Sequence, residues 1–314
     1  MRRYAARRLA SAVLALLGVS VLTFGLGVLA PGEPAEVVLS RSLGQPPTDA
    51  QLTEMRRELG TDRPLPVQYV DWLGGAVRGD FGNSWLRGVK VQDALGERVP
   101  RTAALALSAA ALSLLIGIPI GVLAATRRNT LLDHVSRVGA LFGASLPSFF
   151  LAYVLIWLFA VRSRALPVFG FGSAAHLVLP AVTLALGPAA VLARLTRSAV
   201  LEVLGEDFVR TARSKGARAT AVLFRHALRN ALVPVVTVAG LSVGHLLGGS
   251  LIVEYVFAWP GMGELAVSAI HDRDYPLVQG FVLFAAAVYL VVNLLVDLSY
   301  ARLDPRVRVE GRRP

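Results

Sequence analysis

The sequence has no cysteine, few charged residues and almost no lysine. Charged residues make up 17% of the 314, whereas 54% are hydrophobic and the mean hydropathy is +0.58. A chain without cysteine contains neither a disulfide framework nor a thiolate metal site. A chain this apolar is neither a soluble globular domain nor a disordered one. The class that fits these shortages is a protein of the lipid bilayer.

The only two lysines, Lys90 and Lys215, argue against a P-loop ATPase. A P-loop needs a Gly-Lys-Ser/Thr step to hold the β- and γ-phosphates, but Val89 and Ser214 precede the two lysines. The five histidines show no metal-ligand spacing, and neither a Gly-x-Ser-x-Gly nor a His-Glu-x-x-His motif is present. We therefore expect no catalytic residue, no metal site and no cofactor bound by this chain.

Long apolar blocks take up most of the sequence. A helix of about 20 apolar residues spans a bilayer. The six blocks are 9–30, 102–125, 138–161, 176–193, 231–253 and 277–298. The fourth is the weakest, because Pro180, Gly187 and Pro188 interrupt it. The pattern predicts an all-α, polytopic membrane protein with six transmembrane helices.

The distribution of basic residues predicts the orientation, because cytoplasmic connections carry the excess of arginine and lysine. With the N-terminus inside, the inner connections are 1–8, 126–137, 194–230 and 299–314. The outer connections are 31–101, 162–175 and 254–276. The inner set holds 20 basic and 6 acidic residues, and the outer set 12 and 14. Both termini are therefore predicted to be cytoplasmic. The net charge of +11 then reports orientation rather than a nucleic-acid partner.

This topology divides the chain into four segments. They are 1–30, with the cytoplasmic N-terminus and the first transmembrane helix; 31–100, which is external; 101–300, a five-helix core; and 301–314, a cytoplasmic tail. The core includes a long cytoplasmic connection at 198–230.

The external segment carries helix signals of its own. Thr48 with Gln51 three residues later forms a capping-box pattern, and Gly60 is placed to end that helix. Further short helices are expected at 67–77 and 89–98. The segment is expected either to cap the outer helix ends or to contact a partner or the membrane surface.

The connection at 198–230 carries the clearest signals of a cytoplasmic helix. Glu206 and Asp207 stand where acidic residues favour a helix start, and Arg213 and Lys215 where basic residues favour its end. Gly216 follows as the stop signal. A second helix is predicted to follow the glycine and to continue into the fifth apolar block. Two short helices around a glycine form a projecting elbow.

This elbow resembles the cytoplasmic coupling loop, or EAA loop, of binding-protein-dependent ABC transporter permeases. The general pattern of that loop is Glu-Ala-Ala, three residues, Gly, nine residues, then Ile-x-Leu-Pro. Gly216 and Ala212 match the glycine and the second alanine, whereas Arg210 and Thr211 replace the first two residues. The later positions are occupied by His226, Leu228 and Arg229.

The departures from the general pattern resemble the dipeptide/oligopeptide/nickel branch of that family. Its runs Arg-Thr-Ala-Arg-x-Lys-Gly and Arg-His-Ala-Leu-Arg-Asn-Ala-Leu-x-Pro are found at 210–216 and 225–234. Further matches lie at 62–69, 79–82, 145–149, 253–263 and 304–306. The resemblance covers nearly the whole chain, and the external segment resembles that of the first-type permease subunit.

The resemblance implies the fold of a type I ABC importer permease in the prokaryotic plasma membrane. It also implies three kinds of protein partner: a homologous second permease in a heterodimer, two ATPase subunits that bind ATP and Mg, and an external substrate-binding protein. Peptides are the expected cargo, and nickel, glutathione and glycans stay open.

Two sets of candidate functional residues follow. The coupling residues are Glu206, Asp207, Phe208, Val209, Arg210, Thr211, Ala212, Arg213, Lys215, Gly216 and Arg218. Polar residues inside the spans are candidates for the substrate path, because such residues are costly in lipid, although each could instead be a hydrogen-bonded helix contact. They are His245, Ser250 and Asn293.

The rival class is a secondary transporter that works alone on an ion gradient. Such transporters are built from internal repeats and carry charged residues within the membrane. No repeat is evident in this sequence, and Asp297 is the only acidic residue well inside a span. The sequence therefore favours the importer subunit.

Overall fold

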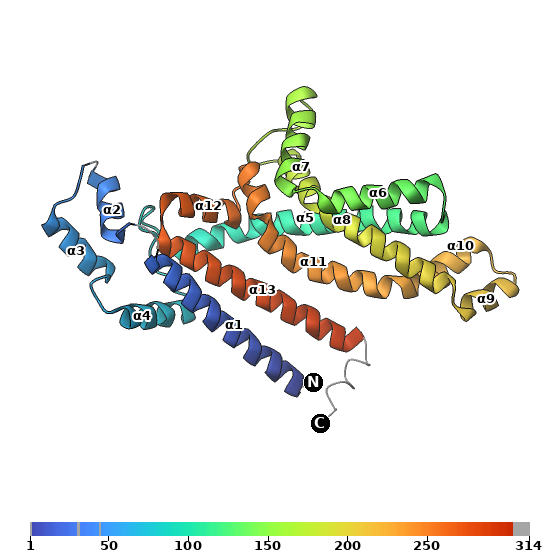
Figure 1. The fold of residues 1–314 in the computed structure, drawn as a ribbon, viewed down its shortest axis with the longest axis horizontal. Coiled ribbons are helices and arrows are strands. Elements are labelled where there is room, and N and C mark those ends of the chain that lie inside the picture. The colour runs from blue at the N-terminus through green and yellow to red at the C-terminus, as the bar shows by residue number, and fades with distance from the viewer. Residues whose placement is uncertain (1, 30–31, 44, 304–314) are drawn as a thin grey trace. The chain divides into compact units, whose positions relative to one another are not determined.

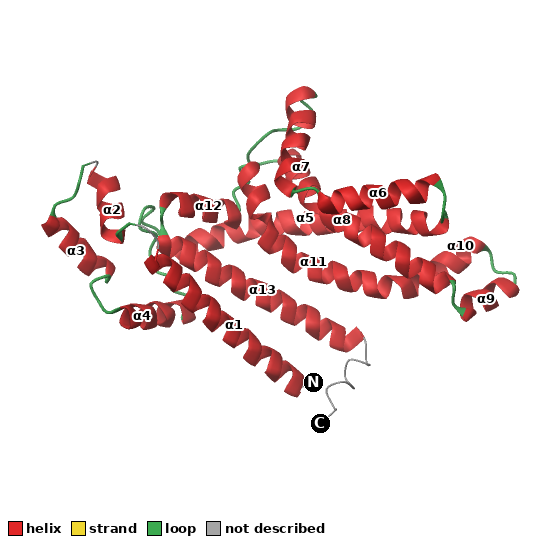
Figure 2. Cartoon of the chain, viewed as in Figure 1, coloured by secondary structure: helices red, strands yellow, loops and turns green. Residues whose placement is uncertain are grey.

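The computed structural model describes residues 2–29, 32–43 and 45–303. Within these ranges the regular elements are helices and no strand is formed, as Figure 2 shows. The all-α prediction is therefore confirmed. The order of the helices along the chain can be followed in Figure 1.

The regular elements of the described residues are thirteen α-helices and two π-helical segments. They are α1 Arg2–Leu29, α2 Pro34–Leu43, α3 Asp49–Leu59, α4 Leu65–Val77, α5 Val91–Thr126, α6 Leu131–Ser145, α7 Ser148–Leu155, η1 Ile156–Arg162, α8 Ala174–Leu204, α9 Asp207–Ser214, α10 Ala219–Ala221, η2 Val222–Ala227, α11 Leu228–Val256, α12 Met262–Asp272 and α13 Tyr275–Leu303.

The apolar blocks become helices long enough to cross a membrane. Five described helices meet that condition by length and composition, or six if the bent pair formed by α6 and α7 with η1 is one span. The polytopic prediction is confirmed. The cytoplasmic position of both termini stays a prediction, and so does the four-segment division that depends on it.

The third apolar block is a broken helix rather than one straight span. The two parts of the pair meet at an angle of 107°. Pro147 lies at the break, and Leu146 before it adopts the extended conformation, with φ −73° and ψ 128°. A residue before proline is disfavoured in the helical region, and proline itself has no N–H to donate. The local sequence therefore explains the bend.

Three other boundaries differ from the expectation. The short helix predicted at 89–98 and the second apolar block form one helix, α5, of 36 residues. Helix α8 continues through Pro180 and Pro188. Helix α2 follows the first span, although no signal in the sequence analysis predicted it.

The chain folds as two compact units. One contains the residues up to Pro100 together with Gly261–Val291, and the other contains Arg101–Pro260 together with the residues from Val292 onward. The division runs through α5 and α13, so each unit contains parts of both helices.

In the first unit, the start of α5 packs against α12 and the start of α13. Val91 and Leu95 are buried there with Leu265 and Leu277. The carboxylate of Asp274 is also buried and accepts hydrogen bonds from the Ser84 hydroxyl and, at 3.2 Å, from the Trp85 backbone N–H. These contacts fasten the loop before α5 to the corner between α12 and α13.

A charged pair joins α3 to Glu33, the residue directly before α2 in the same unit. Arg56 donates hydrogen bonds to both carboxylate oxygens of Glu33, one of them at 2.8 Å. These hydrogen bonds lower the pKa of Glu33 below its ordinary value, against the opposing effect of burial. The capping box of Thr48 and Gln51 is present at the start of α3, and Gly60 ends the helix with φ 68°. Both local predictions are confirmed.

In the second unit, two glycines bring α5 against α8. A Cβ on Gly117 would lie 2.7 Å from the Ala189 carbonyl oxygen, and one on Gly121 would lie 2.5 Å from the Ala193 oxygen. Small residues permit such close helix contacts in membrane proteins. The two glycines thus set the spacing between α5 and the middle of α8.

We predict that Gly121→Ala destabilises the protein by about 1–3 kcal/mol, because the added methyl overpacks the contact with α8. The measurement is the free energy of unfolding in detergent by chemical denaturation. Gly139→Ala is the matched control, since a Cβ there meets nothing within 4 Å and alanine is the better helix former. Equal effects of the two substitutions would contradict the close α5–α8 contact.

Candidate functional site

The coupling segment, residues 198–230, forms the elbow that the sequence predicts. It comprises the end of α8, helix α9, the turn at Gly216, helix α10, the π-helical η2 and the start of α11. Within the second unit, α9 and α10 lie beyond the adjacent ends of α8 and α11 (Figure 1). The helix after the glycine continues into the fifth apolar block, as expected.

Helix α9 begins and ends where the charge pattern indicates. Glu206 is its N-cap in extended conformation, and its carbonyl oxygen accepts from the N–H groups of Val209 and Arg210 at 3.1 and 3.3 Å. Asp207 lies in the first turn and Arg213 in the last. Both signs match the helix dipole, which favours acids at the N-terminus and bases at the C-terminus.

Gly216 closes the helix with a left-handed turn. Its φ is +79°, a conformation that costs residues with a side chain about 1–2 kcal/mol. Its N–H bonds the Arg213 oxygen at 2.9 Å, and the N–H of Ala217 bonds the Ala212 oxygen at 3.2 Å. These two bonds form a Schellman motif. Because a Cβ at Gly216 would meet nothing within 4 Å, the turn needs glycine for its backbone rather than for space.

Helix α9 has one inward face and a wide outward face. Val209 is fully buried and Ala212 is half-buried, so these two residues fix the helix to the chain itself. The other candidate coupling residues are exposed: Glu206, Asp207, Phe208, Arg210, Thr211, Arg213, Lys215, Gly216 and Arg218. Val209 therefore holds α9 in position from inside the elbow and does not lie on its outer surface.

The outward face is basic with aromatic side chains. Phe208 is 42% exposed on α9. Phe224, which the sequence analysis did not single out, is 63% exposed on η2. The sequence signal that could have identified Phe224 is that it is a large apolar residue within a strongly basic stretch. The Arg210–Asp207 pair, at 3.4 Å, lies in solvent and adds little stability.

The inward side of the elbow packs against the long helices of the second unit. Helix α9 packs against η2, where Val222 is buried. Beneath them a cluster joins Ala125 at the end of α5, Val200 on α8 and Ala231 on α11. Helix α9 thus contacts η2, and η2 contacts the cluster that joins three long helices through Leu223.

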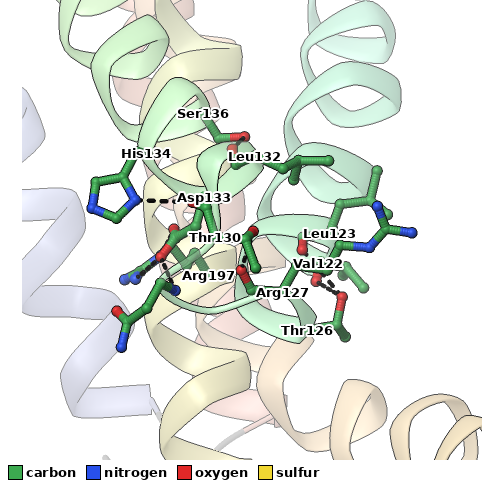
Figure 3. Close-up of polar contacts among 11 residues, drawn as sticks. Val122, Leu123, Thr126, Arg127, Thr130, Leu132, Asp133, His134, Ser136 and Arg197 are labelled. Atoms are coloured by element: carbon green, nitrogen blue, oxygen red, sulfur yellow. Dashed lines mark hydrogen bonds and ion pairs between the residues drawn. The ribbon is translucent and has the colours of Figure 1, made fainter.

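A buried ion pair anchors α8 just before the elbow. Arg197 donates from Nε to Asp133 Oδ1 at 2.6 Å and from Nη2 to Asp133 Oδ2 at 2.8 Å. The Asn129 backbone N–H adds a third hydrogen bond at 3.0 Å. Figure 3 shows Asp133 between Arg197 and the turn that precedes α6. The Asp133 side chain is completely buried and that of Arg197 is 18% exposed, so this pair is shielded from water.

The structure describes the side chains of two of the three residues proposed for the substrate path. Ser250 is buried in α11, and Asn293 is half-buried in α13. The side chain of His245 lies outside the described residues. Their role in transport stays a prediction. Among the described residues, no group of histidine and acidic side chains could hold a metal ion.

We predict that Asp133→Asn lowers the free energy of unfolding by more than Asp207→Asn does, because it leaves the Arg197 guanidinium without its carboxylate partner. Chemical denaturation of the purified protein measures the loss. Asp207→Asn removes the carboxylate of an exposed pair and is expected to cost at most about 1 kcal/mol. A small loss for Asp133→Asn would show that the pair does not anchor α8.

Comparison with known families and proteins gives a consistent result. The family described as binding-protein-dependent transport system inner membrane component matches residues 117–309, and the N-terminal family of the same membrane components matches residues 1–106. The chain is 42% identical over 313 residues to the "Probable peptide ABC transporter permease protein y4tP" of Sinorhizobium fredii, covering 97% of this chain and 99% of that one. It is 40% identical over 309 residues to the glutathione transport system permease protein GsiC of Escherichia coli, covering 98% and 99%.

Solved structures share the fold. The MetNI methionine ABC transporter, in an inward-facing conformation, contains a chain that matches with a TM-score of 0.53 at 24% identity. An amino acid ABC transporter with histidines matches with a TM-score of 0.54 at 16% identity. Each match covers 67% of this chain and 94% of the other.

Proposed function

The chain belongs to the family of binding-protein-dependent transport system inner membrane components, and from this premise we propose that it carries small peptides through the membrane. It is a permease subunit of an ABC importer, a multi-pass protein of the plasma membrane with no catalytic activity of its own. ATPase subunits, an external binding protein and a second permease are the partners that the family implies.

The observation that supports coupling through residues 206–218 is that α9 has an exposed outer face and an inner side that is packed against the rest of the chain. Helix α9 presents Phe208, Arg210 and Arg213 outward, while its inward side packs against η2. Leu223 of η2 in turn packs against the cluster that joins α5, α8 and α11. The planar guanidinium of arginine pairs with a carboxylate through two parallel hydrogen bonds, and aromatic side chains supply apolar contact. In our proposal α9 docks in a groove of an ATPase subunit, and closure of the ATPases moves these three helices.

The proposed assembly has two permeases and two ATPase subunits. The second permease is homologous but distinct, so that the pair forms a heterodimer around one pathway. ATP and Mg bind to the ATPase subunits, and the binding protein delivers substrate from outside. In this assembly the permease turns nucleotide-driven motion into alternating access.

Peptide cargo is supported by two of the relatives. One carries a peptide permease name at 42% identity, and the other belongs to a glutathione transport system at 40% identity. Glutathione is itself a tripeptide, so both names describe the same chemical class. No feature of the described residues favours a metal ion or a glycan instead.

We predict ATP-dependent peptide uptake when the chain is reconstituted in liposomes with its second permease, ATPase subunits and binding protein. Uptake of a labelled tripeptide should require ATP and should be abolished by vanadate. The purified chain alone, given a proton gradient, should show no uptake. Gradient-driven uptake by the chain alone would support a secondary transporter and contradict the proposal.

We predict that Gly216→Val uncouples ATP hydrolysis from transport, because a β-branched residue is strained at φ +79°. A strain of about 1–2 kcal/mol corresponds to roughly a 5- to 30-fold loss of the docked elbow. Peptide transported per ATP hydrolysed, measured in the reconstituted transporter, should fall by a similar factor. Gly216→Asn is the control, since asparagine tolerates the left-handed conformation and should retain coupling. Intact coupling in Gly216→Val would remove the role assigned to this turn.

A further inference from the structure

A basic cavity lies between α5, α6 and α8 of the second unit. Its volume is about 790 Å³, within the range of small-molecule sites. Arg128 follows α5, Arg137 lies on α6 and Arg194 lies on α8, and all three line it. They are exposed, and none of the described lining residues carries a carboxylate. The cavity is therefore suited to an anion.

The fourth arginine of the lining, Arg197, is already used by the protein. Its guanidinium is held by Asp133 in the buried pair shown in Figure 3, so its charge is neutralised. That pair, with the backbone hydrogen bond from Asn129, fixes the turn before α6 to α8. The close contact of Gly121 with α8 fixes the third wall. The positions from which the three other arginines extend are therefore held before any ligand arrives.

The opposite part of the cavity is apolar and open. Ile120, Val138 and Leu141 line it and are 38%, 54% and 65% exposed. Ile120 lies on α5, which is long and apolar enough to cross a membrane, and Val138 and Leu141 lie on α6, the first half of the bent pair that meets the same condition as one span. A small inorganic anion would leave such a wall uncovered. An amphiphile with an anionic head and an acyl chain would contact both parts.

The predicted topology places this cavity where a lipid headgroup lies. The connection 126–137 and the start of the coupling segment belong to the basic, inner side of the chain. The cytoplasmic leaflet is rich in anionic lipid, and basic pockets between transmembrane helices on that side bind anionic headgroups. We propose that the cavity binds the phosphate headgroup of an anionic phospholipid, with its acyl chain along α5 and α6.

The proposal is tested by lipid binding to the full-length chain in its assembled transporter. Native mass spectrometry would give the affinity for dioleoylphosphatidylglycerol and for the zwitterionic dioleoylphosphatidylcholine, each titrated into detergent. The wild type should prefer the anionic lipid. Each basic residue near an anionic surface contributes about fivefold in affinity. The combined R128Q, R137Q and R194Q variant should therefore lose on the order of 100-fold for phosphatidylglycerol alone.

Two further variants keep the result interpretable. R78Q, R87Q and R164Q together remove three exposed arginines elsewhere and should leave the affinity unchanged. The corresponding lysine variant, R128K, R137K and R194K, retains the charge and should retain most of the binding. If the triple glutamine variant does not fold, the single variants R137Q and R194Q replace it in the comparison. Each is expected to lose about fivefold in affinity for phosphatidylglycerol.

Three results would overturn the proposal. Unchanged phosphatidylglycerol affinity in the glutamine variants would show that the lipid binds elsewhere. Competition by inorganic phosphate at equal affinity would identify a site for free anions. Loss of the ATPase subunits from the complex, with lipid affinity unchanged, would identify a docking surface for a protein.

Discussion

The exclusion of water from the bilayer is the constraint on which this structure depends. An unpaired backbone N–H or C=O group in hydrocarbon costs several kcal/mol, so spanning segments must satisfy their own hydrogen bonds. The chain meets this condition with long helices, and α8 continues through two prolines. Where the helix does break, at Leu146 and Pro147, the freed groups must find partners within the protein. The 107° bend at that point is a departure from a simple bundle of straight spans.

Features that depend on a few neighbouring residues could be predicted from the sequence. The capping box at Thr48, the left-handed glycines Gly60 and Gly216 and the bounds of α9 follow from backbone geometry and the helix dipole. The apolar blocks were equally clear, since their length matches the thickness of a bilayer. These predictions needed no knowledge of distant contacts.

The remaining features depend on contacts between distant parts of the chain. Asp133 and Arg197 are 64 residues apart, and each looked like an ordinary charge in a basic connection. Their pairing, and the close approach of Gly121 to α8, became visible only after the helices were placed. The same holds for Val209, since periodicity marks an apolar face but does not decide whether the chain or a partner covers it. Phe224 was overlooked because it stands among residues that predict exposure.

The basic residues on the predicted inner side have three different roles. Their excess sets the orientation, which requires only their number and side. Those on α9 face outward from a short helix that packs against η2, so in the proposed function their positions matter for docking. Arg197 has neither role, because its charge is neutralised by the buried carboxylate of Asp133. Because Arg197 pairs with the Asp133 carboxylate, one buried pair both anchors α8 and leaves the neighbouring cavity, lined by Arg128, Arg137 and Arg194, positive.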